Sequence, residues 1–195
     1  MKIFVISDTH GRLDRVYDVY RVLAKNGVPD LIVHCGDHYD DASEISRHLG
    51  KRVLAVRGNC DRSFSEDEYA ILETEAGNFL VTHGHMQNVG YSKQNLYYKA
   101  QELDCVGAIY GHTHRADNSN IGDFLFLNPG SLSFPRDGSG GTFAILNTQE
   151  NFAEAKIWNY DDFMLVDSVN NPGTGNKPKV KGGKLRDLFN YSDGF

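Results

Sequence analysis

Seven side chains of the kinds that bind metal ions follow closely behind five short apolar segments of this 195-residue chain. They are Asp8, His10, Asp37, Asn59, His83, His112 and His114. Their carboxylate, imidazole and amide groups form a mixed oxygen and nitrogen donor set, which suits Mn, Fe, Co, Ni or Zn better than Ca or Mg. Because a catalytic ion keeps an open position and takes about three donors from the protein, seven donors predict two ions that share one carboxylate.

Two pairs of these donors, Asp8 with His10 and His112 with His114, are spaced as i and i+2. In extended chain, residues two positions apart point to the same side, so we expect both members of each pair to face one centre. Glycines stand beside the donors at positions 11, 36, 58, 84 and 111. They would permit tight turns and close approach of the backbone to the site.

The segments that position these donors alternate between strand and helix patterns up to about residue 110. Runs of β-branched and other apolar residues predict strands at 2–7, 31–35, 52–56, 69–73, 78–82 and 106–110. Apolar residues at helical spacing predict helices near 12–25, 42–49 and 96–103. This alternation favours a largely parallel sheet, and parallel sheets bind ligands at the carboxyl ends of their strands, where the donors stand.

The last third of the chain has a different pattern. Segments 124–127, 142–147 and 152–160 resemble strands joined by glycine-rich turns, with no convincing helix between them, so we expect this part to be antiparallel. From residue 171 the sequence becomes rich in Gly, Pro and basic residues. We therefore expect a domain over 1–170 and a mobile tail over 171–195.

Composition narrows the classes of function. The chain carries 20 Lys and Arg against 26 Asp and Glu, a formal charge of −6, which gives no clear surface for nucleic acid. Three scattered cysteines indicate reduced thiols, not a disulfide framework. The sequence shows no signal peptide and no apolar run long enough for a membrane span. We expect a cytoplasmic protein without a membrane partner, and a homo-oligomer stays open.

Five ordered motifs carry a resemblance to a known family. They are Asp8-Thr9-His10, Gly36-Asp37-His38-Tyr39-Asp40, Gly58-Asn59-Cys60-Asp61, Thr82-His83-Gly84-His85 and Gly111-His112-Thr113-His114. Together they resemble the calcineurin-like metallophosphoesterases, above all the small bacterial and archaeal phosphodiesterases, and Asn128-Pro129-Gly130-Ser131 followed by Arg136 adds to the likeness. The resemblance implies an α/β fold, a four-layer α/β/β/α sandwich of two mixed sheets flanked by helices.

The resemblance also implies roles for the donors. One ion would be held by Asp8, His10, Asp37 and His114, and the other by Asp37, Asn59, His83 and His112. The ions would be divalent, Mn in first place with Ni, Co, Fe, Zn or Mg as alternatives. A hydroxide bridging them would attack the phosphorus of a small phosphate ester in line. Two ions offset by Asp8 and Asp37 leave a local charge of about +2, which explains how an acidic protein would bind phosphate.

Residues around the donors support weaker expectations. Besides Asp37 and Asn59, we place His85 at the catalytic centre, as a phosphate contact or as a hydrogen-bond partner of a ligand. Arg12 and Arg136 are further candidates for a phosphate contact. Asp40 and Asp61 are interpreted as supporting carboxylates. Isolated histidines are more often structural than ligands, which is our interpretation of His34, His38 and His48, and Cys35 and Cys105 are expected in the core.

The chain departs from the family pattern at one position. Where this chain has Cys60, many relatives have a histidine, which is usually assigned to protonating or stabilising the leaving group. The substitution favours a phosphodiesterase, with a phosphomonoesterase or nucleotidase as the alternative. A third alternative is a binding scaffold without catalysis, because a retromer subunit of similar fold serves as an interaction platform with an incomplete ligand set.

Overall fold

The computed structural model describes residues 1–62 and 67–170, so the predicted tail over 171–195 lies outside the described residues. Ten strands are described: β1 (Lys2–Ile6), β2 (Leu31–His34), β3 (Val53–Ala55), β4 (Tyr69–Thr74), β5 (Gly77–Thr82), β6 (Gly107–Tyr110), β7 (Ala116–Ile121), β8 (Phe124–Pro129), β9 (Thr142–Gln149) and β10 (Phe152–Asn159). Four helices accompany them: α1 (Asp14–Lys25), α2 (Tyr39–Leu49), α3 (Gln94–Glu102) and α4 (Tyr160–Asn170). The strands and helices predicted up to residue 110 are all present, with ends shifted by a few residues.

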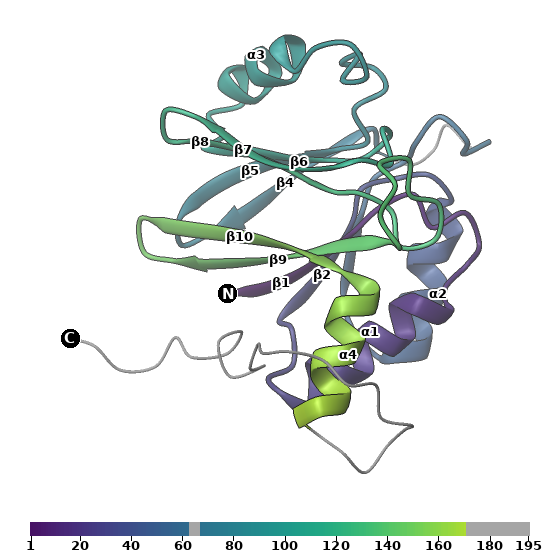
Figure 1. The fold of residues 1–195 in the computed structure, drawn as a ribbon. Helices are drawn as coiled ribbons and strands as arrows, with labels where there is room; N and C mark the ends of the chain where they lie inside the picture. Colours follow the sequence, from purple (N-terminus) through teal and green to yellow (C-terminus); the bar gives the residue numbers. More distant parts are fainter. Residues whose placement is uncertain (63–66, 171–195) are drawn as a thin grey trace.

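The strands form two five-stranded sheets that lie face to face (Figure 1). One has the order β10-β9-β1-β2-β3 and the other β4-β5-β6-β8-β7. Helices α1, α2 and α4 cover the outer face of the first sheet, and α3 covers the outer face of the second. Both sheets contain parallel and antiparallel pairs. The four-layer sandwich of two mixed sheets is therefore confirmed.

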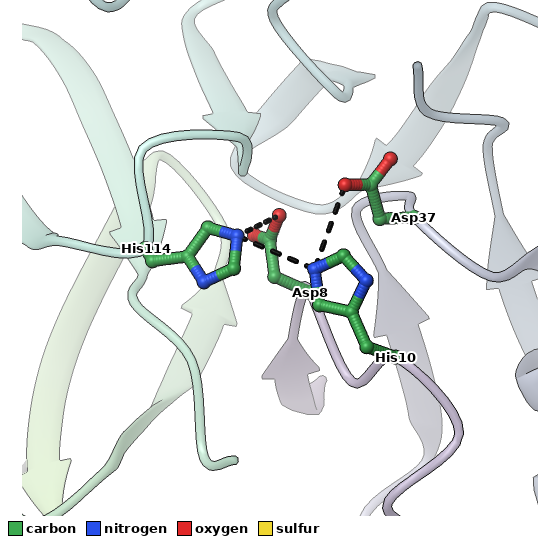
Figure 2. Close-up of side chains that lie close together, drawn as sticks. All are labelled: Asp8, His10, Asp37 and His114. Atoms are coloured by element: carbon green, nitrogen blue, oxygen red, sulfur yellow. Dashed lines mark hydrogen bonds and ion pairs between the residues drawn. The ribbon is translucent and has the colours of Figure 1, made fainter. Parts of the chain in front are cut away.

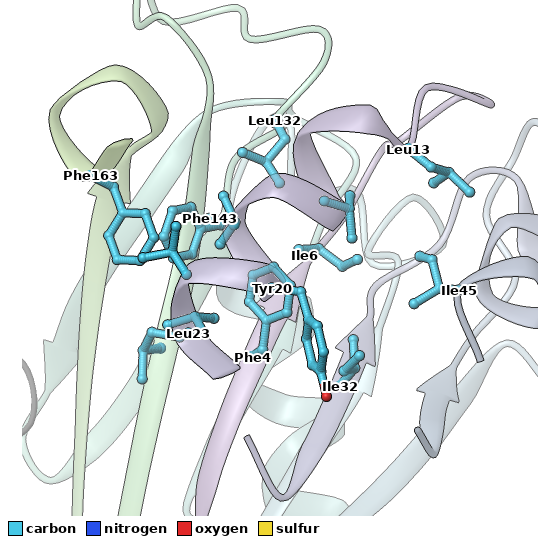
Figure 3. Packing of buried hydrophobic residues seen from close by; sticks show 14 residues of the cluster. Phe4, Ile6, Leu13, Tyr20, Leu23, Ile32, Ile45, Leu132, Phe143 and Phe163 are labelled. Atoms are coloured by element: carbon cyan, nitrogen blue, oxygen red, sulfur yellow. The ribbon is translucent and has the colours of Figure 1, made fainter. Parts of the chain in front are cut away.

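Three buried apolar clusters fill the three interfaces between the four layers. Along β1, Phe4 and Ile6 face the helices, in the cluster drawn in Figure 3, whereas Ile3 and Val5 face the second sheet. A third cluster packs the second sheet against α3. Burial on both faces explains why β1 is a continuous apolar run instead of an alternating one.

The chain from residue 160 onward differs from the prediction. The sequence pattern assigns no element to residues 161–170, but α4 follows β10 directly and packs against α1. Most of its apolar residues form one contiguous run, from Phe163 to Val166, without the helical spacing that would have revealed the helix. Phe163 is fully buried, with its ring edge-on to Phe143 at 5.0 Å and to Trp158 at 5.7 Å. Burial of this one ring anchors the helix on the first sheet.

A second difference is strand β7, whose polar sequence gave no strand signal. It forms the edge of the second sheet, pairs antiparallel with β8, and exposes many of its side chains. Strand β8 itself runs parallel to β6, so the last third is only partly antiparallel. Edge strands of polar composition are hard to recognise because one side of the ladder faces solvent.

The parallel pairs decide where the donors meet. Strands β1, β2 and β3 are parallel neighbours, and so are β5 and β6 in the other sheet. The loops that carry the predicted donors leave the carboxyl ends of these five strands. None of the helices in the described parts of the chain is both long and apolar enough to cross a membrane.

Candidate metal centre

Four of the seven predicted donors converge on one point. Donor atoms of Asp8, His10, Asp37 and His114 all lie within 4.8 Å of one another (Figure 2). Nε2 of His114 is 3.3 Å from Oδ1 of Asp8, and Nε2 of His10 is 3.7 Å from Oδ2 of Asp37. All but the partly exposed His10 are buried. This is the group that the family resemblance assigned to one ion.

The other predicted group meets on the opposite side of Asp37. Nε2 of His83 lies 3.3 Å from Oδ1 of Asp37 and 3.1 Å from Oδ1 of Asn59. The ring of His112 stands edge-on to that of His83, with the centroids 5.1 Å apart. The fold therefore brings all seven predicted donors to one edge of the sandwich.

The protonation state of His83 indicates whether His83, Asp37 and Asn59 could bind a cation together. Its Nδ1 lies 2.8 Å from the carbonyl oxygen of Cys35, which can only accept, so Nδ1 carries the proton. Burial lowers the pKa of His83 to about 4, so the ring is neutral at pH 7 and Nε2 presents a lone pair. That lone pair faces oxygens of Asp37 and Asn59, which are acceptors too. Acceptors that converge without a proton between them fit a metal ion.

Asp8 gives a second test. Its Oδ2 accepts hydrogen bonds from the Ser7 hydroxyl at 2.6 Å and from the backbone N–H of His112 at 3.1 Å. Its Oδ1 is fully buried and has no hydrogen-bond partner among the described residues. Burial raises the pKa of Asp8 to about 7. An ion bound to Oδ1 would offset the cost of that buried charge, so the residues present fit a divalent metal.

The carboxyl group of Asp37 is tuned in the opposite direction. Burial raises its pKa, but the nearby His83 and a 2.9 Å hydrogen bond from the backbone N–H of Cys60 outweigh burial and hold the pKa below its ordinary value. Asp37 is therefore ionised at pH 7. A carboxylate that keeps its charge is suited to contact two cations at once.

The expectation that the paired donors lie in extended chain is wrong. Asp8, His10, His112 and His114 do not lie in extended chain: their φ angles are 55°, 47°, 69° and 56°, in the left-handed region, and Asp37 joins them at 60°. Non-glycine residues rarely adopt this conformation, and it costs free energy. Here tight loops, and not strand alternation, aim the paired side chains at one centre.

Two of the glycines are required because other atoms lie too close to their Cα for a side chain to fit. A Cβ at Gly58 would collide with Oδ1 of Asp37, and a Cβ at Gly111 would collide with the Ser7 hydroxyl. Both substitutions would push directly on a donor or on its hydrogen-bond partner. The expectation of close backbone approach is confirmed at these positions.

Several side chains that hold the donor loops were missed or only partly expected. The Ser7 hydroxyl binds Asp8, and the Ser131 hydroxyl donates to the backbone oxygen of Asp8 at 2.8 Å. Asp61 accepts from the backbone N–H groups of Tyr39 and Gly58, both at 2.7 Å, and so joins two donor loops as a supporting carboxylate. Asp40 is exposed, and the buried carboxylate of that helix turn is Asp41. Helical spacing could have revealed Asp41, because it stands four residues before the buried Ile45.

The remaining candidates surround the donors. The ring of His85 lies 5.3 Å from that of His83, and its buried Nδ1 has no partner among the described residues. Arg12 stacks over the ring of Phe134 at 4.7 Å. The backbone N–H of Arg136 donates to the carbonyl oxygen of His114 at 2.9 Å, and its side chain is exposed.

The histidines and cysteines interpreted as structural lie outside the donor set. His34 is fully buried and hydrogen-bonded to Thr9, and the ring of His48 stacks on Tyr17 at 4.2 Å. His38 is exposed, with its ring edge-on to His10 at 5.3 Å. Cys35 and Cys105 are buried, and Cys60 is exposed beside Asn59.

Comparison with known proteins agrees with the fold and with the family resemblance. Residues 1–151 match the calcineurin-like phosphoesterase superfamily domain. Over 172 residues, 87% of this chain and 98% of the relative, the sequence is 31% identical to the probable metallophosphoesterase YsnB of Bacillus subtilis. It is 28% identical to the phosphodiesterase MJ0936 of Methanocaldococcus jannaschii, covering 77% of this chain and 95% of that protein. A crystal structure from Streptococcus pneumoniae, described as that of a predicted phosphoesterase, superposes with a TM-score of 0.68 at 29% identity, covering 82% and 90% of the two chains. With a divalent-metal donor cluster at the carboxyl ends of its strands, the chain belongs to the calcineurin-like phosphoesterase superfamily.

Proposed function

We propose that this protein is a two-metal phosphodiesterase that acts on small phosphate esters. The observation that carries the proposal is that the two carboxylate oxygens of Asp37 face different histidines. Its Oδ2 faces His10 and its Oδ1 faces His83. Each oxygen thus points into a different group of donors. One carboxylate placed between two donor groups supports a pair of ions that share it.

Mn is the ion we assign, with Fe, Co, Ni, Zn or Mg as alternatives, because the donors mix carboxylate, imidazole and amide groups. When bound, two such ions neutralise phosphoryl oxygens and make water a nucleophile at neutral pH. The chain's own residues do the rest. The ring of His85 lies beside that of His83, and its Nδ1, which has no partner among the described residues, would bind a phosphate oxygen. Burial lowers the pKa of His114, the charge of Arg136 lowers it further, and this charge would attract the same anion.

The preference for diesters rests on Cys60 and on relatives. A thiol is a weak donor for a departing alkoxide, and partial burial together with the neighbouring Asp37 raises the pKa of Cys60 to about 11. A phosphodiester with a good leaving group needs less help of this kind. The relative from Methanocaldococcus jannaschii is named a phosphodiesterase, which supports the same choice. All three cysteines are free thiols, in keeping with a reducing, cytoplasmic compartment.

The test is metal content and hydrolysis measured on the same preparation. The metal-stripped chain would be reloaded with Mn²⁺, its metal counted by mass spectrometry, and its turnover measured on bis(p-nitrophenyl) phosphate and on p-nitrophenyl phosphate. Two ions per chain with faster diester hydrolysis support the proposal. Faster monoester hydrolysis would favour the phosphomonoesterase, and two bound ions without turnover on either ester would favour a scaffold.

A further inference from the structure

A buried carboxylate holds the loop that carries Asp8 and His10, without contacting the predicted metal-binding atoms. Asp41 lies in the first turn of α2 and is 6% exposed. Its Oδ2 accepts a 2.6 Å hydrogen bond from the hydroxyl of Thr9 and a 2.7 Å hydrogen bond from the backbone N–H of Gly11. These two donors flank His10 in the chain, so one oxygen atom fixes both sides of a predicted ligand.

A second buried side chain completes the arrangement. The Thr9 hydroxyl has a single proton, which goes to Asp41, so its oxygen accepts from Nε2–H of His34 at 2.8 Å. Thr9 and His34 are both fully buried. The hydroxyl therefore has one donor and one acceptor in fixed directions, which leaves Thr9 little freedom.

The loop needs this support because its backbone is strained. Asp8 and His10 have φ angles of 55° and 47°, and neither is a glycine. Such conformations persist only where surrounding contacts impose them. Without the bonds to Asp41, the segment from Thr9 to Gly11 would relax to ordinary angles and carry the His10 ring away from Asp37 and His114.

We propose that Asp41 and Thr9 are positioning residues that set the affinity of the site formed by Asp8, His10, Asp37 and His114 for a divalent cation. The inference rests on the proposed metal binding, but not on hydrolysis. Asp41 acts through the loop, since the contacts of its Oδ2 are with Thr9 and Gly11 and not with a donor atom. Residues that orient metal ligands in this way commonly change affinity by about 10- to 100-fold when replaced.

The experiment is isothermal titration of Mn²⁺ into the metal-stripped full chain. Thr9→Val removes the hydroxyl at nearly constant shape, and Asp41→Ala removes the other end of the same hydrogen bond. We expect either change to raise the Kd for Mn²⁺ by about tenfold or more. Thr9→Ser keeps the hydroxyl and should stay within about threefold of wild type. Asp40→Ala removes an exposed carboxylate from the same helix turn, so it is the matched control for charge and should leave the Kd unchanged.

The melting temperature of the metal-free variants separates positioning from stability. A purely structural role would lower the melting temperature of Thr9→Val and leave its Kd for Mn²⁺ at the wild-type value, and this result would overturn the inference. If one variant fails to fold, the other still decides, because each breaks the same hydrogen bond. A wild-type chain that binds no Mn²⁺ would also overturn it, whereas binding without hydrolysis would contradict only the proposed function.

Discussion

Nε2 of His10 and Nε2 of His114 lie 3.4 Å apart, although 104 residues separate them in the chain. Their rings are stacked with an interplanar angle of 23°. Nδ1 of His114 lies 2.6 Å from the carbonyl oxygen of Phe134 and must carry the proton, so Nε2 presents a lone pair. A lone pair held this close to another imidazole nitrogen and to Oδ1 of Asp8 suits a shared cation, and loops that are distant in sequence impose this geometry.

Replacing the shared carboxylate should damage both donor groups at once. We expect Asp37→Asn to lower kcat/KM for a diester by several orders of magnitude, and excess Mn²⁺ should not restore it. His114→Ala removes a donor from one group only, so excess metal should recover part of its activity. Near-normal activity of Asp37→Asn at saturating metal would mean that Asp37 does not bridge.

Metal binding near pH 7 should displace a proton from Asp8. Burial raises the pKa of Asp8 to about 7, so this carboxyl group is about half protonated in the metal-free protein at that pH. Because the ion needs the ionised form, its apparent affinity should fall as the pH drops below 7. Titration of Mn²⁺ in two buffers of different ionisation enthalpy should report about half a proton more released by wild type than by Asp8→Asn at pH 7, and close to one more at pH 6.

The proton released by metal-bound water is common to both proteins, so the difference between them isolates Asp8, and His83 should contribute none at pH 7, since burial keeps its pKa near 4. Equal proton release by wild type and by Asp8→Asn would assign the proton to another group.

Much of the fold was predictable because its central strands are buried on both faces. Short continuous apolar runs such as β1 and β2 are typical of strands that are buried on both faces in an α/β domain. The two elements that escaped prediction lie at the margins. Strand β7 is a polar edge, and α4 owes its place to tertiary contacts such as the packing of Phe163, which no local pattern encodes.

The chemistry of the site was more predictable than its geometry. Donor types and their positions after strands follow from the sequence, so all seven donors could be named in advance. Their directions depend on left-handed backbone at Asp8 and His10, and that conformation depends on Asp41, a contact across 30 residues or more of chain. Sequence spacing cannot report such a contact, which explains why the extended-chain argument was wrong.

His34 should make the stability of the protein depend on pH. Burial lowers its pKa to about 4, against roughly 6.5 in the unfolded chain. Between these values the unfolded state binds a proton that the folded state does not. The contribution is therefore fully present above about pH 6.5 and is lost as the pH falls to about 4, on the order of 3 kcal/mol in all.

Denaturant unfolding of metal-free wild type and His34→Gln at pH 7 and pH 5 measures this effect. The difference between the two proteins isolates His34 from the other titrating groups, and we expect the slope with pH to be smaller in the variant. His48→Gln, at an exposed histidine, is the control and should keep the wild-type slope. An identical slope in His34→Gln would place the proton uptake elsewhere.

Arg136 should contribute to substrate binding more than to turnover. Burial lowers the pKa of His112, Asp37 opposes this effect, and the guanidinium of Arg136 lowers the pKa further, so we expect the charge of Arg136 to act on a phosphate bound beside the donors. We expect Arg136→Gln to raise KM for a phosphate ester by about tenfold with kcat within a few-fold of wild type. Arg115→Gln removes the same charge from an exposed residue beside His114 and should leave KM unchanged. An equal rise of KM in both variants would mean that Arg136 acts only through the overall positive charge of this surface and not through contact with the phosphate.

Cys60 should decide the preference between diesters and monoesters. Its backbone N–H binds Oδ1 of Asp37 and its Sγ lies 3.5 Å from Nδ2 of Asn59, so this side chain stands beside the donor groups. Partial burial and the nearby Asp37 together raise the pKa of the thiol to about 11, so at pH 7 Cys60 is a neutral and weak hydrogen-bond donor. An imidazole with a pKa near 6.5 would protonate a leaving alkoxide far better.

We therefore expect wild-type kcat/KM to be higher for bis(p-nitrophenyl) phosphate than for p-nitrophenyl phosphate, and Cys60→His to shift the ratio toward the monoester. The shift should grow with leaving groups poorer than nitrophenolate, because these depend most on a proton donor. Cys60→Ser keeps a small neutral side chain at this position and serves as the matched control, with a ratio close to that of wild type. A ratio indifferent to Cys60→His, in an enzyme already faster on monoesters, would make Cys60 a packing residue and move the assignment to a phosphomonoesterase.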